Sequence, residues 1–246
     1  MLINNSFYIK PSFGTNHRHF HAGPLKEKIY TTSYVCREDL YFDELVDYMI
    51  ENYKSSPKVN VYSLACSDGS EAWTLAMFLR ERNAHKFLPI KGVDIEPSIL
   101  SNANSKCLNV RNLEIERLKK FGIDFSKYFE PSDKNMLILA DSMENETKTY
   151  SARDFIKNDF FAERKTILQE VSEMTNEYPK VVLCRNVFPY IGDDNESIYH
   201  IKVISEKLAK NDLFVIGDYD RSKRFVENLK NFGFTKVSYN MFKKIR

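Results

Sequence analysis

Hydrophobic positions recur along this chain at two spacings, one typical of helices and one typical of strands. Between residues 41 and 53, apolar side chains stand at Phe42, Leu45, Val46, Met49 and Ile50, which is the spacing of one face of a helix. The same spacing predicts further helices over 72–82, 98–107, 113–120, 164–174, 196–209 and 222–232. Runs rich in β-branched residues predict buried strands over 58–65, 89–95, 181–184 and 213–217. Strands that alternate with helices predict an α/β fold with a doubly wound, mostly parallel, Rossmann-like sheet.

One region departs from this alternation. Residues 136–140 and 149–155 predict the two strands of a hairpin whose turn lies at 143–146. We therefore interpret residues 108–153 as a small β subdomain inserted into a main domain that covers 31–246. Residues 1–30 contain several glycines and prolines and predict an irregular N-terminal arm.

Composition narrows the class of protein. The 246 residues include 36 Lys and Arg against 34 Asp and Glu, so the net charge is +2 and nucleic acid is not an expected partner. Only 8 residues are glycine, and neither a dinucleotide-binding G-x-G-x-x-G nor a P-loop motif occurs. The four cysteines are widely spaced, which favours reduced thiols. Without an apolar run long enough to span a membrane, and without a signal peptide at residue 1, we expect no membrane insertion and a cytoplasmic location.

Ligands of parallel sheets bind beyond the carboxyl ends of the strands, so the loops after the predicted strands are the candidate site. The loop after the first strand has small residues at Ala65 and Cys66 and a single glycine, Gly69, before Glu71. It is a poor phosphate cradle and better suits a ligand such as S-adenosylmethionine, whose ammonium group Glu71 could pair with. Alternatively, Glu71 and Asp68 simply stabilise the positive end of the next helix.

Two further strand ends carry polar residues. Asp94 ends the second strand, where an acidic side chain reaches the ribose hydroxyls of a bound nucleoside; it could instead cap the helix near Pro97. Arg185, Asn186 and Tyr190 follow a buried strand and are too polar for packing alone. His17, His19 and His21 alternate in the N-terminal arm and would face one side if extended. A solvated polar arm explains them better than metal binding, so we predict no metal site.

Five segments of the sequence together resemble one family, the CheR-type chemotaxis receptor methyltransferases. The family's T-x-F-F-R is similar to Ser33–Arg37, and its S-x-A-x-S-T-G-E-E-P-Y-S-I-A-M is similar to Ser63–Met77. Its D-I-D and C-R-N-V-x-x-Y-F are similar to Asp94–Glu96 and Cys184–Ile191, and its R-Y-F to Lys127–Phe129. The resemblance implies transfer of a methyl group from S-adenosyl-L-methionine to receptor glutamate side chains, leaving S-adenosyl-L-homocysteine.

The resemblance also implies roles for individual residues. Arg37 and Tyr190 would face the methyl group and the acceptor as the catalytic residues. A glutamate carboxylate is already ionised near neutral pH, so the reaction needs orientation rather than a strong base. The family's N-L pair falls on Asp154 and Phe155, with Asp141 and Ser142 as the weaker candidates. The residues implied to surround the cofactor are Ser33, Arg37, Ala65, Glu71, Asp94, Ile95, Asp154, Phe155, Arg185 and Asn186.

Three departures from the family pattern leave the acceptor open. The residues before Thr31 lack the pattern of the family's helical N-terminal domain, so we expect that domain to be missing. Val35 and Cys36 replace the aromatic pair before Arg37, and the stretch 156–178 is longer than expected. The leading hypothesis is a methyltransferase acting on a protein carboxylate, such as that of a chemoreceptor. The alternatives are a methyltransferase for a small molecule or another acceptor, and a non-catalytic cofactor-binding module.

Overall fold

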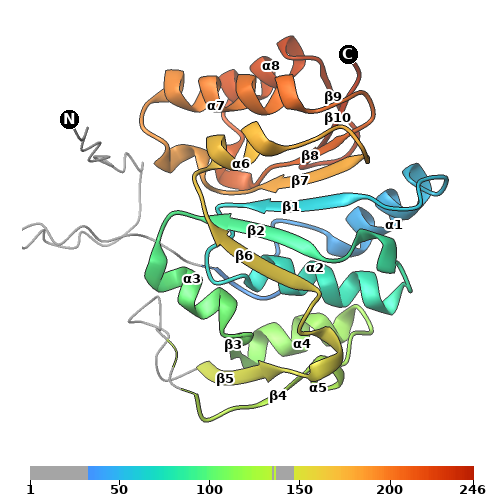
Figure 1. Ribbon diagram of the computed structural model, residues 1–246, viewed down its shortest axis with the longest axis vertical. Coiled ribbons are helices and arrows are strands. Elements are labelled where there is room, and N and C mark those ends of the chain that lie inside the picture. Colours follow the sequence, from blue (N-terminus) through green and yellow to red (C-terminus); the bar gives the residue numbers. More distant parts are fainter. Residues whose placement is uncertain (1–32, 135, 137–146) are drawn as a thin grey trace, which may run out of the picture.

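A seven-stranded sheet forms the centre of the computed structural model, which describes residues 33–134, 136 and 147–246 (Figure 1). The order across the sheet is β6-β2-β1-β7-β8-β10-β9. The first five strands run parallel, and β10 is antiparallel to β8 and β9. The bounds are β1 (Asn60–Leu64), β2 (Ile90–Asp94), β6 (Phe160–Arg164), β7 (Lys180–Cys184), β8 (Leu213–Val215), β9 (Phe234–Lys236) and β10 (Met241–Lys244).

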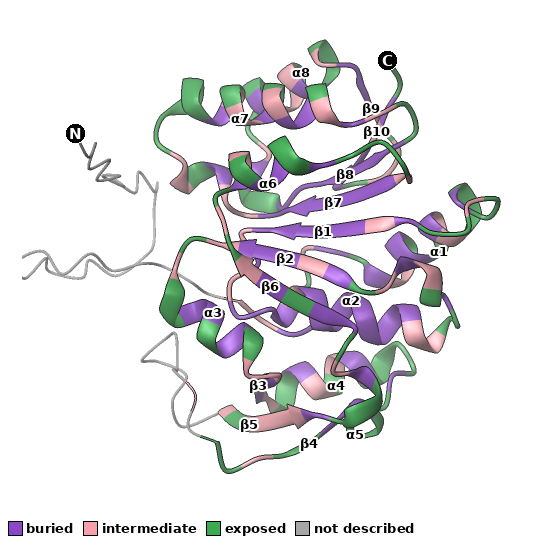
Figure 2. Cartoon of the chain, viewed as in Figure 1, coloured by how far each residue is buried: buried purple, intermediate pink, exposed green. Residues whose placement is uncertain are grey.

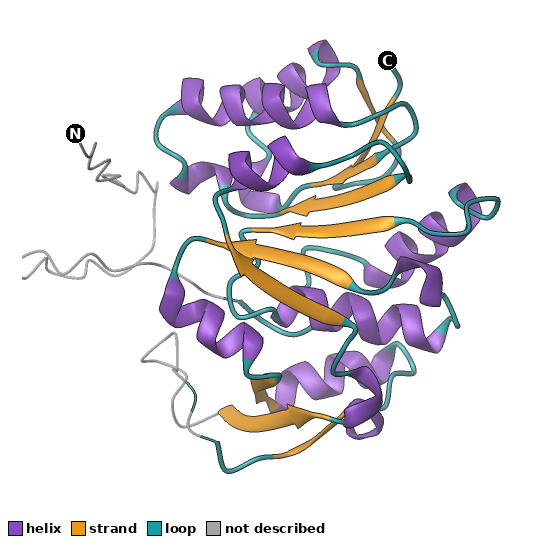
Figure 3. Ribbon diagram, in the orientation of Figure 1, coloured by secondary structure: helices purple, strands orange, loops and turns teal. Residues whose placement is uncertain are grey.

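Helices cover both faces of this sheet, because successive strand residues point to opposite sides (Figure 3). In β7, Val181 and Leu183 join one core and Val182 joins the other. The first core is closed by α1 (Phe42–Asn52) and α2 (Ser70–Glu81), and the second by α6 (Ile167–Glu173), α7 (Asp194–Lys207) and α8 (Lys223–Asn231). The central strands are almost entirely buried as a result (Figure 2). The predicted α/β class with a mostly parallel Rossmann-like sheet is confirmed.

The chain reverses its direction of travel across the sheet between β1 and β7. From β1 it proceeds to β2 and β6 on one side, and it then returns to the other side of β1 as β7. The arrowheads of these strands point to one edge of the sheet, called the carboxyl edge below (Figure 1). Beyond the ends of β1 and β7 lies the topological switch point, the place where ligands bind in doubly wound sheets.

A second, antiparallel sheet has the strand order β3-β5-β4. Its strands are β3 (Cys107–Arg111), β4 (Phe129–Pro131) and β5 (Thr147–Ala152). Along the chain, the helices α4 (Asn112–Lys120) and α5 (Phe125–Tyr128) lie between β3 and β4. The predicted strand at 149–155 is therefore found, but it ends earlier and pairs with β3 and β4. Of the predicted partner at 136–140, only Met136 is described, and it is not in a strand.

Several predicted bounds were wrong in this part of the chain. The helix predicted over 98–107 is α3 (Pro97–Asn104), and Cys107 already begins β3. The helix predicted over 164–174 is α6, which starts only at Ile167. The residues before it form β6, an unpredicted strand of the main sheet, so the long stretch 156–178 supplies a complete strand and helix. Strands β9 and β10 were not predicted either. In the part of the chain that the structure describes, no helix is long and apolar enough to cross a membrane.

Candidate functional site

The loop after β1 makes a tight curl at the carboxyl edge. Ala65, Ser67 and Gly69 have φ values of 56°, 52° and 85°, all in the left-handed region. A side chain at Gly69 would bring its Cβ within 2.4 Å of Phe160 Cε1 in β6, so glycine is required both by φ and by space. The curl places Glu71 in the first turn of α2, beside the switch point.

Asp94 lies at the carboxyl edge as the last residue of β2, the strand beside β1. Its Oδ2 accepts a hydrogen bond from the Ser67 amide at 2.9 Å, and its Oδ1 accepts one from the Glu96 amide at 3.1 Å. Glu96, rather than Asp94, caps α3, because its side chain accepts from the Ser98 amide at 3.2 Å. The half-buried Asp94 carboxylate keeps acceptor capacity for ribose hydroxyls. Beside it the apolar side chain of Ile95 is 59% exposed.

A buried arginine after β7 contacts the first turn of α2 and the segment before α1. The side chain of Arg185 is 1% exposed, and it donates through Nη1 to Glu71 at 2.6 Å and through Nη2 to Asp39 at 2.5 Å. Glu71 also accepts from the Ser63 hydroxyl at 3.2 Å. Burial alone would lower the pKa of Arg185, but the two carboxylates outweigh it and raise that pKa, so the guanidinium is charged.

The loop after β7 is held by a second carboxylate that the sequence did not single out. Asp220 accepts hydrogen bonds from the amides of Asn186, Gly217 and Phe188 at 2.6, 2.8 and 3.1 Å. Burial raises the pKa of Asp220 to about 6, although the three amides lower it in part. Asn186 then reaches across with its side chain, which donates to Asp39 Oδ2 at 2.7 Å and accepts from the Tyr219 amide at 3.1 Å.

The segment before α1 brings the remaining predicted residues to this edge. The Cys36 amide donates to Thr74 Oγ1 of α2 at 2.9 Å, and the Ser33 hydroxyl bonds to the Asp68 carboxylate. Arg37 lies over the ring of Tyr34, 5.7 Å from its centroid, and its Nε is 3.5 Å from Asp39 Oδ1. Tyr190 is half-buried in the short helix Phe188–Tyr190 that follows the β7 loop.

The structure does not bring Asp154 and Phe155 to this edge. They precede β6, which runs parallel to β2, so they lie at the amino ends of the strands. There the Phe155 carbonyl accepts from Arg80 Nη2 at 3.0 Å, near the end of α2, and Asp154 forms an exposed ion pair with Lys157. Their prediction as cofactor-binding residues is therefore wrong. The residue level with Asp94 in the sheet is Arg164, at the end of the strand that the sequence did not reveal. Asp141 and Ser142 lie outside the described residues.

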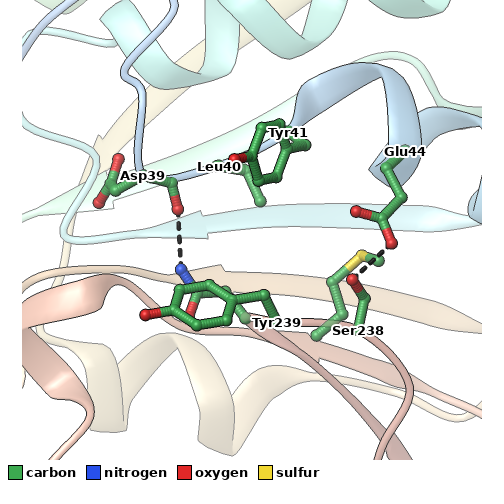
Figure 4. Close-up of a pocket in the computed structure, with 8 residues that line it drawn as sticks. Asp39, Leu40, Tyr41, Glu44, Ser238 and Tyr239 are labelled. Atoms are coloured by element: carbon green, nitrogen blue, oxygen red, sulfur yellow. Dashed lines mark hydrogen bonds between the residues drawn. The ribbon is translucent and has the colours of Figure 1, made fainter.

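A narrow groove lies next to these residues, between the segment before α1 and the start of β10 (Figure 4). The Asp39 carbonyl accepts from Asn240 Nδ2 at 2.8 Å, and Ser238 bonds to Glu44 farther along. Tyr41 and Tyr239 lie on its two walls, 59% and 50% exposed.

The structure adds three residues to those predicted: Asp39, Asp220 and Asn240. Asp220 could have been found from the sequence, because it is an acidic residue in the loop directly after the strand predicted over 213–217. Asp39 has no local signal, because its hydrogen-bond partners Arg185, Asn186 and Asn240 are more than a hundred residues away. The residues that the structure describes contain no cluster of His, Cys, Asp or Glu suited to a metal ion. His17, His19 and His21 lie outside them.

These residues fit S-adenosylmethionine. The half-buried Asp94 carboxylate and the exposed Ile95 are suited to the nucleoside part of the cofactor. The ion pair of Glu71 with Arg185 is suited to the charged amino-acid part of the cofactor. Two buried donors at the edge, Ser67 Oγ and Arg185 Nε, have no hydrogen-bond partner within the described structure, so a ligand could satisfy them. The loop after β1 has one glycine, which suits a cofactor that carries no phosphate.

The sheet order and this edge define the class of protein as a Rossmann-like, S-adenosylmethionine-dependent methyltransferase. A family model described as "CheR methyltransferase, SAM binding domain" matches residues 31–238, and the chain belongs to this family. Its cofactor is S-adenosylmethionine. A Pseudomonas putida protein named "Putative methyltransferase Cher3" is 22% identical over 189 residues, which cover 75% of this chain. The match covers only 63% of that relative, so the chain spans less than two thirds of its length.

Two solved structures are similar to this chain over most of its length. The N-methyltransferase NodS of Bradyrhizobium japonicum is 11% identical, with 85% of this chain and 100% of that chain covered and a TM-score of 0.41. Magnesium protoporphyrin IX methyltransferase of Synechocystis, with S-adenosylhomocysteine bound, is 12% identical, with 81% and 80% covered and a TM-score of 0.38.

Proposed function

We propose that this chain methylates glutamate carboxylates of a protein, such as a chemoreceptor. The observation that carries the proposal is that the part of the carboxyl edge that the structure describes holds carboxylates, guanidinium groups and amides but no histidine and no readily ionised thiol. The thiols of Cys66 and Cys184 are buried, which raises their pKa well above the usual range. Among the described residues, the histidines are His85 and His200, which lie outside the loops at this edge. An acceptor that is already ionised fits such a site best.

The chemistry then divides between cofactor and chain. The cofactor supplies a methyl group made electrophilic by its sulfonium. A glutamate oxygen forms the new bond to the methyl carbon while the carbon–sulfur bond breaks, and no proton moves. The chain contributes orientation, which can account for a large part of a rate enhancement. We assign the acceptor carboxylate to Arg37 and Tyr190, whose guanidinium and hydroxyl can hold it by hydrogen bonds.

Cofactor contacts are assigned to the residues that the fold gathers at the same edge. They are Ser33, Arg37, Ala65, Glu71, Asp94, Ile95, Arg185 and Asn186. The four cysteines are free and buried, which supports a reducing compartment such as the cytoplasm as the place of action.

The experiment uses radiolabelled S-adenosylmethionine and cytoplasmic fragments of chemoreceptors from the same source. We expect the label to enter the receptor fragment and to be released as methanol by mild base, because a carboxyl methyl ester is base-labile. Label that resists base would contradict a carboxylate acceptor and favour another acceptor class. Cofactor binding without any transfer would instead favour the non-catalytic module.

Variants test the assigned roles. Arg37→Ala should lower the rate of methyl transfer by about a hundredfold, the usual cost of losing a group that holds the reacting charge. Tyr190→Phe should also lower the rate of methyl transfer, without altering the fold. Arg82→Ala is the matched control, because Arg82 forms only a surface ion pair with Asp47 and stands at the end of α2. Equal rates in Arg37→Ala and Arg82→Ala would show that Arg37 does not hold the acceptor.

A further inference from the structure

Asp39 is the point where three separate parts of the carboxyl edge meet. Its Oδ1 accepts from Arg185 Nη2 at 2.5 Å and lies 3.5 Å from Arg37 Nε. Its Oδ2 accepts from Asn186 Nδ2 at 2.7 Å, and its carbonyl accepts from Asn240 Nδ2 at 2.8 Å. One residue thus ties the segment that carries Arg37 to the loop after β7 and to the start of β10.

The Asp39 carboxylate is charged despite its burial. Its side chain is 12% exposed, and burial alone would raise its pKa. Arg185, Asn186 and Arg37 outweigh that effect and lower the pKa. The charges balance locally, because the two guanidinium groups of Arg37 and Arg185 face the carboxylates of Asp39 and Glu71. Loss of Asp39 would leave a buried guanidinium with one carboxylate partner instead of two.

Asp39 also contacts Arg185, Asn186 and Arg37, three of the residues to which we assign cofactor binding. The two terminal nitrogens of the Arg185 guanidinium bind different carboxylates, those of Glu71 and Asp39, so the orientation of the side chain depends on both. The Asn186 side chain is fixed between Asp39 and the Tyr219 amide. Arg37 stands two residues before Asp39 in a segment without regular secondary structure, so the anchor limits where its backbone can lie.

We propose that Asp39 is a positioning residue of the cofactor site. It acts through Arg185, Asn186 and Arg37. The side chains of these three residues form a cradle of hydrogen-bond donors, and the Asp39 carboxylate fills this cradle. The proposal concerns cofactor binding and is independent of which acceptor the enzyme methylates.

The test measures S-adenosylhomocysteine binding by calorimetry in Asp39→Gly and Asp39→Asn. Asp39→Gly empties the cradle, and we expect the dissociation constant to rise by about tenfold or more, as for loss of hydrogen bonds to charged groups. Formate should restore much of the affinity of this variant, since a small carboxylate can occupy the emptied cradle. Chloride at equal ionic strength should not.

Two comparisons make the test decisive. Asp39→Asn should weaken binding without rescue by formate, because its amide fills the cradle but brings no charge to face the guanidinium groups. Glu38→Ala is the matched control from the same segment, since Glu38 is exposed and pairs with Arg117 on the surface; its affinity should equal that of the wild type.

Wild-type affinity in folded Asp39→Gly would overturn the proposal. The same holds if formate raises only the melting temperature of that variant and leaves its affinity unchanged, because Asp39 would then have a structural role alone. If Asp39→Gly does not fold, Asp39→Asn decides: weakened binding supports the proposal, and wild-type binding overturns it.

Discussion

At the scale of single residues, the site depends on close approach as much as on charge. Gly217 lies two residues after β8 and has an ordinary extended backbone, φ −97° and ψ 173°, so its conformation does not require glycine. Space does require it. A Cβ at this position would lie 2.0 Å from Asn186 Oδ1, the atom that accepts from the Tyr219 amide. The missing side chain of Gly217 therefore leaves room for the Asn186 side chain, which reaches Asp39.

Replacing this glycine gives a prediction about binding. Gly217→Ala should displace the Asn186 side chain and weaken S-adenosylhomocysteine binding by about tenfold, since at least one hydrogen bond to a charged group is lost. Isothermal calorimetry of the folded variant measures this directly. An unchanged dissociation constant would mean that Asn186 has no part in holding the cofactor.

Gly122→Ala is the matched control. Gly122 has φ +76°, but a Cβ there meets nothing within 4 Å. Alanine in this left-handed conformation should cost about 1 kcal/mol of stability and leave cofactor affinity unchanged.

At the scale of elements, the two edges of the sheet have different tasks. The carboxyl edge holds the candidate site, and ion pairs fasten the elements at the amino edge. Arg80 at the end of α2 forms a bidentate pair with Asp159, just before β6, at 2.7 and 2.6 Å. Lys180 is the first residue of β7, and Asp212 immediately precedes β8. Their side chains, 0% and 3% exposed, form a buried ion pair at 3.0 Å.

Breaking the buried pair should destabilise the fold without altering the site. Lys180→Met should lower the free energy of unfolding by about 3–5 kcal/mol, because it leaves the Asp212 carboxylate buried without its cation. Urea unfolding measures the change, and calorimetry should give a wild-type affinity for S-adenosylhomocysteine. Lys202→Met serves as the control: its exposed pair with Glu206 spans 3.9 Å and should contribute less than about 1 kcal/mol. Similar losses in both variants would contradict a special role for the buried pair.

Elements with strong local patterns were predictable from the sequence, and those defined by their neighbours were not. The strands β1, β2, β7 and β8 are apolar and β-branched, so their sequences alone indicated them. In β6 and β3, short stretches with polar residues become strands because they pair with β2 and β5. The family resemblance placed the N-L pair on Asp154 and Phe155, which precede β6, whereas the residue level with Asp94 is Arg164, ten positions after Asp154.

At the scale of the whole molecule, the candidate site draws on nearly the full length of the described chain. Asp39 comes from the segment before α1, Asp94 from the end of β2, and Asn240 from the position just before β10. Contacts such as Asn186 with Asp39 join residues separated by 147 positions. Such pairs exist only after the sheet has formed, which explains why motifs predicted Arg185 and Asn186 but gave no sign of their anchor.

A ligand bound at such a site should stabilise the whole fold, because its contacts exist only in the folded state. S-adenosylhomocysteine at 100 times its dissociation constant should add about 2.7 kcal/mol to the free energy of unfolding. For a domain of this size, that corresponds to a rise in melting temperature of roughly 5–10 °C. ATP at the same concentration should produce little change, because the loop after β1 offers one glycine and no phosphate cradle. Glu71→Ala should reduce the shift by removing a partner of Arg185. No shift with saturating S-adenosylhomocysteine, or an equal shift with ATP, would contradict the assignment of the cofactor to this edge.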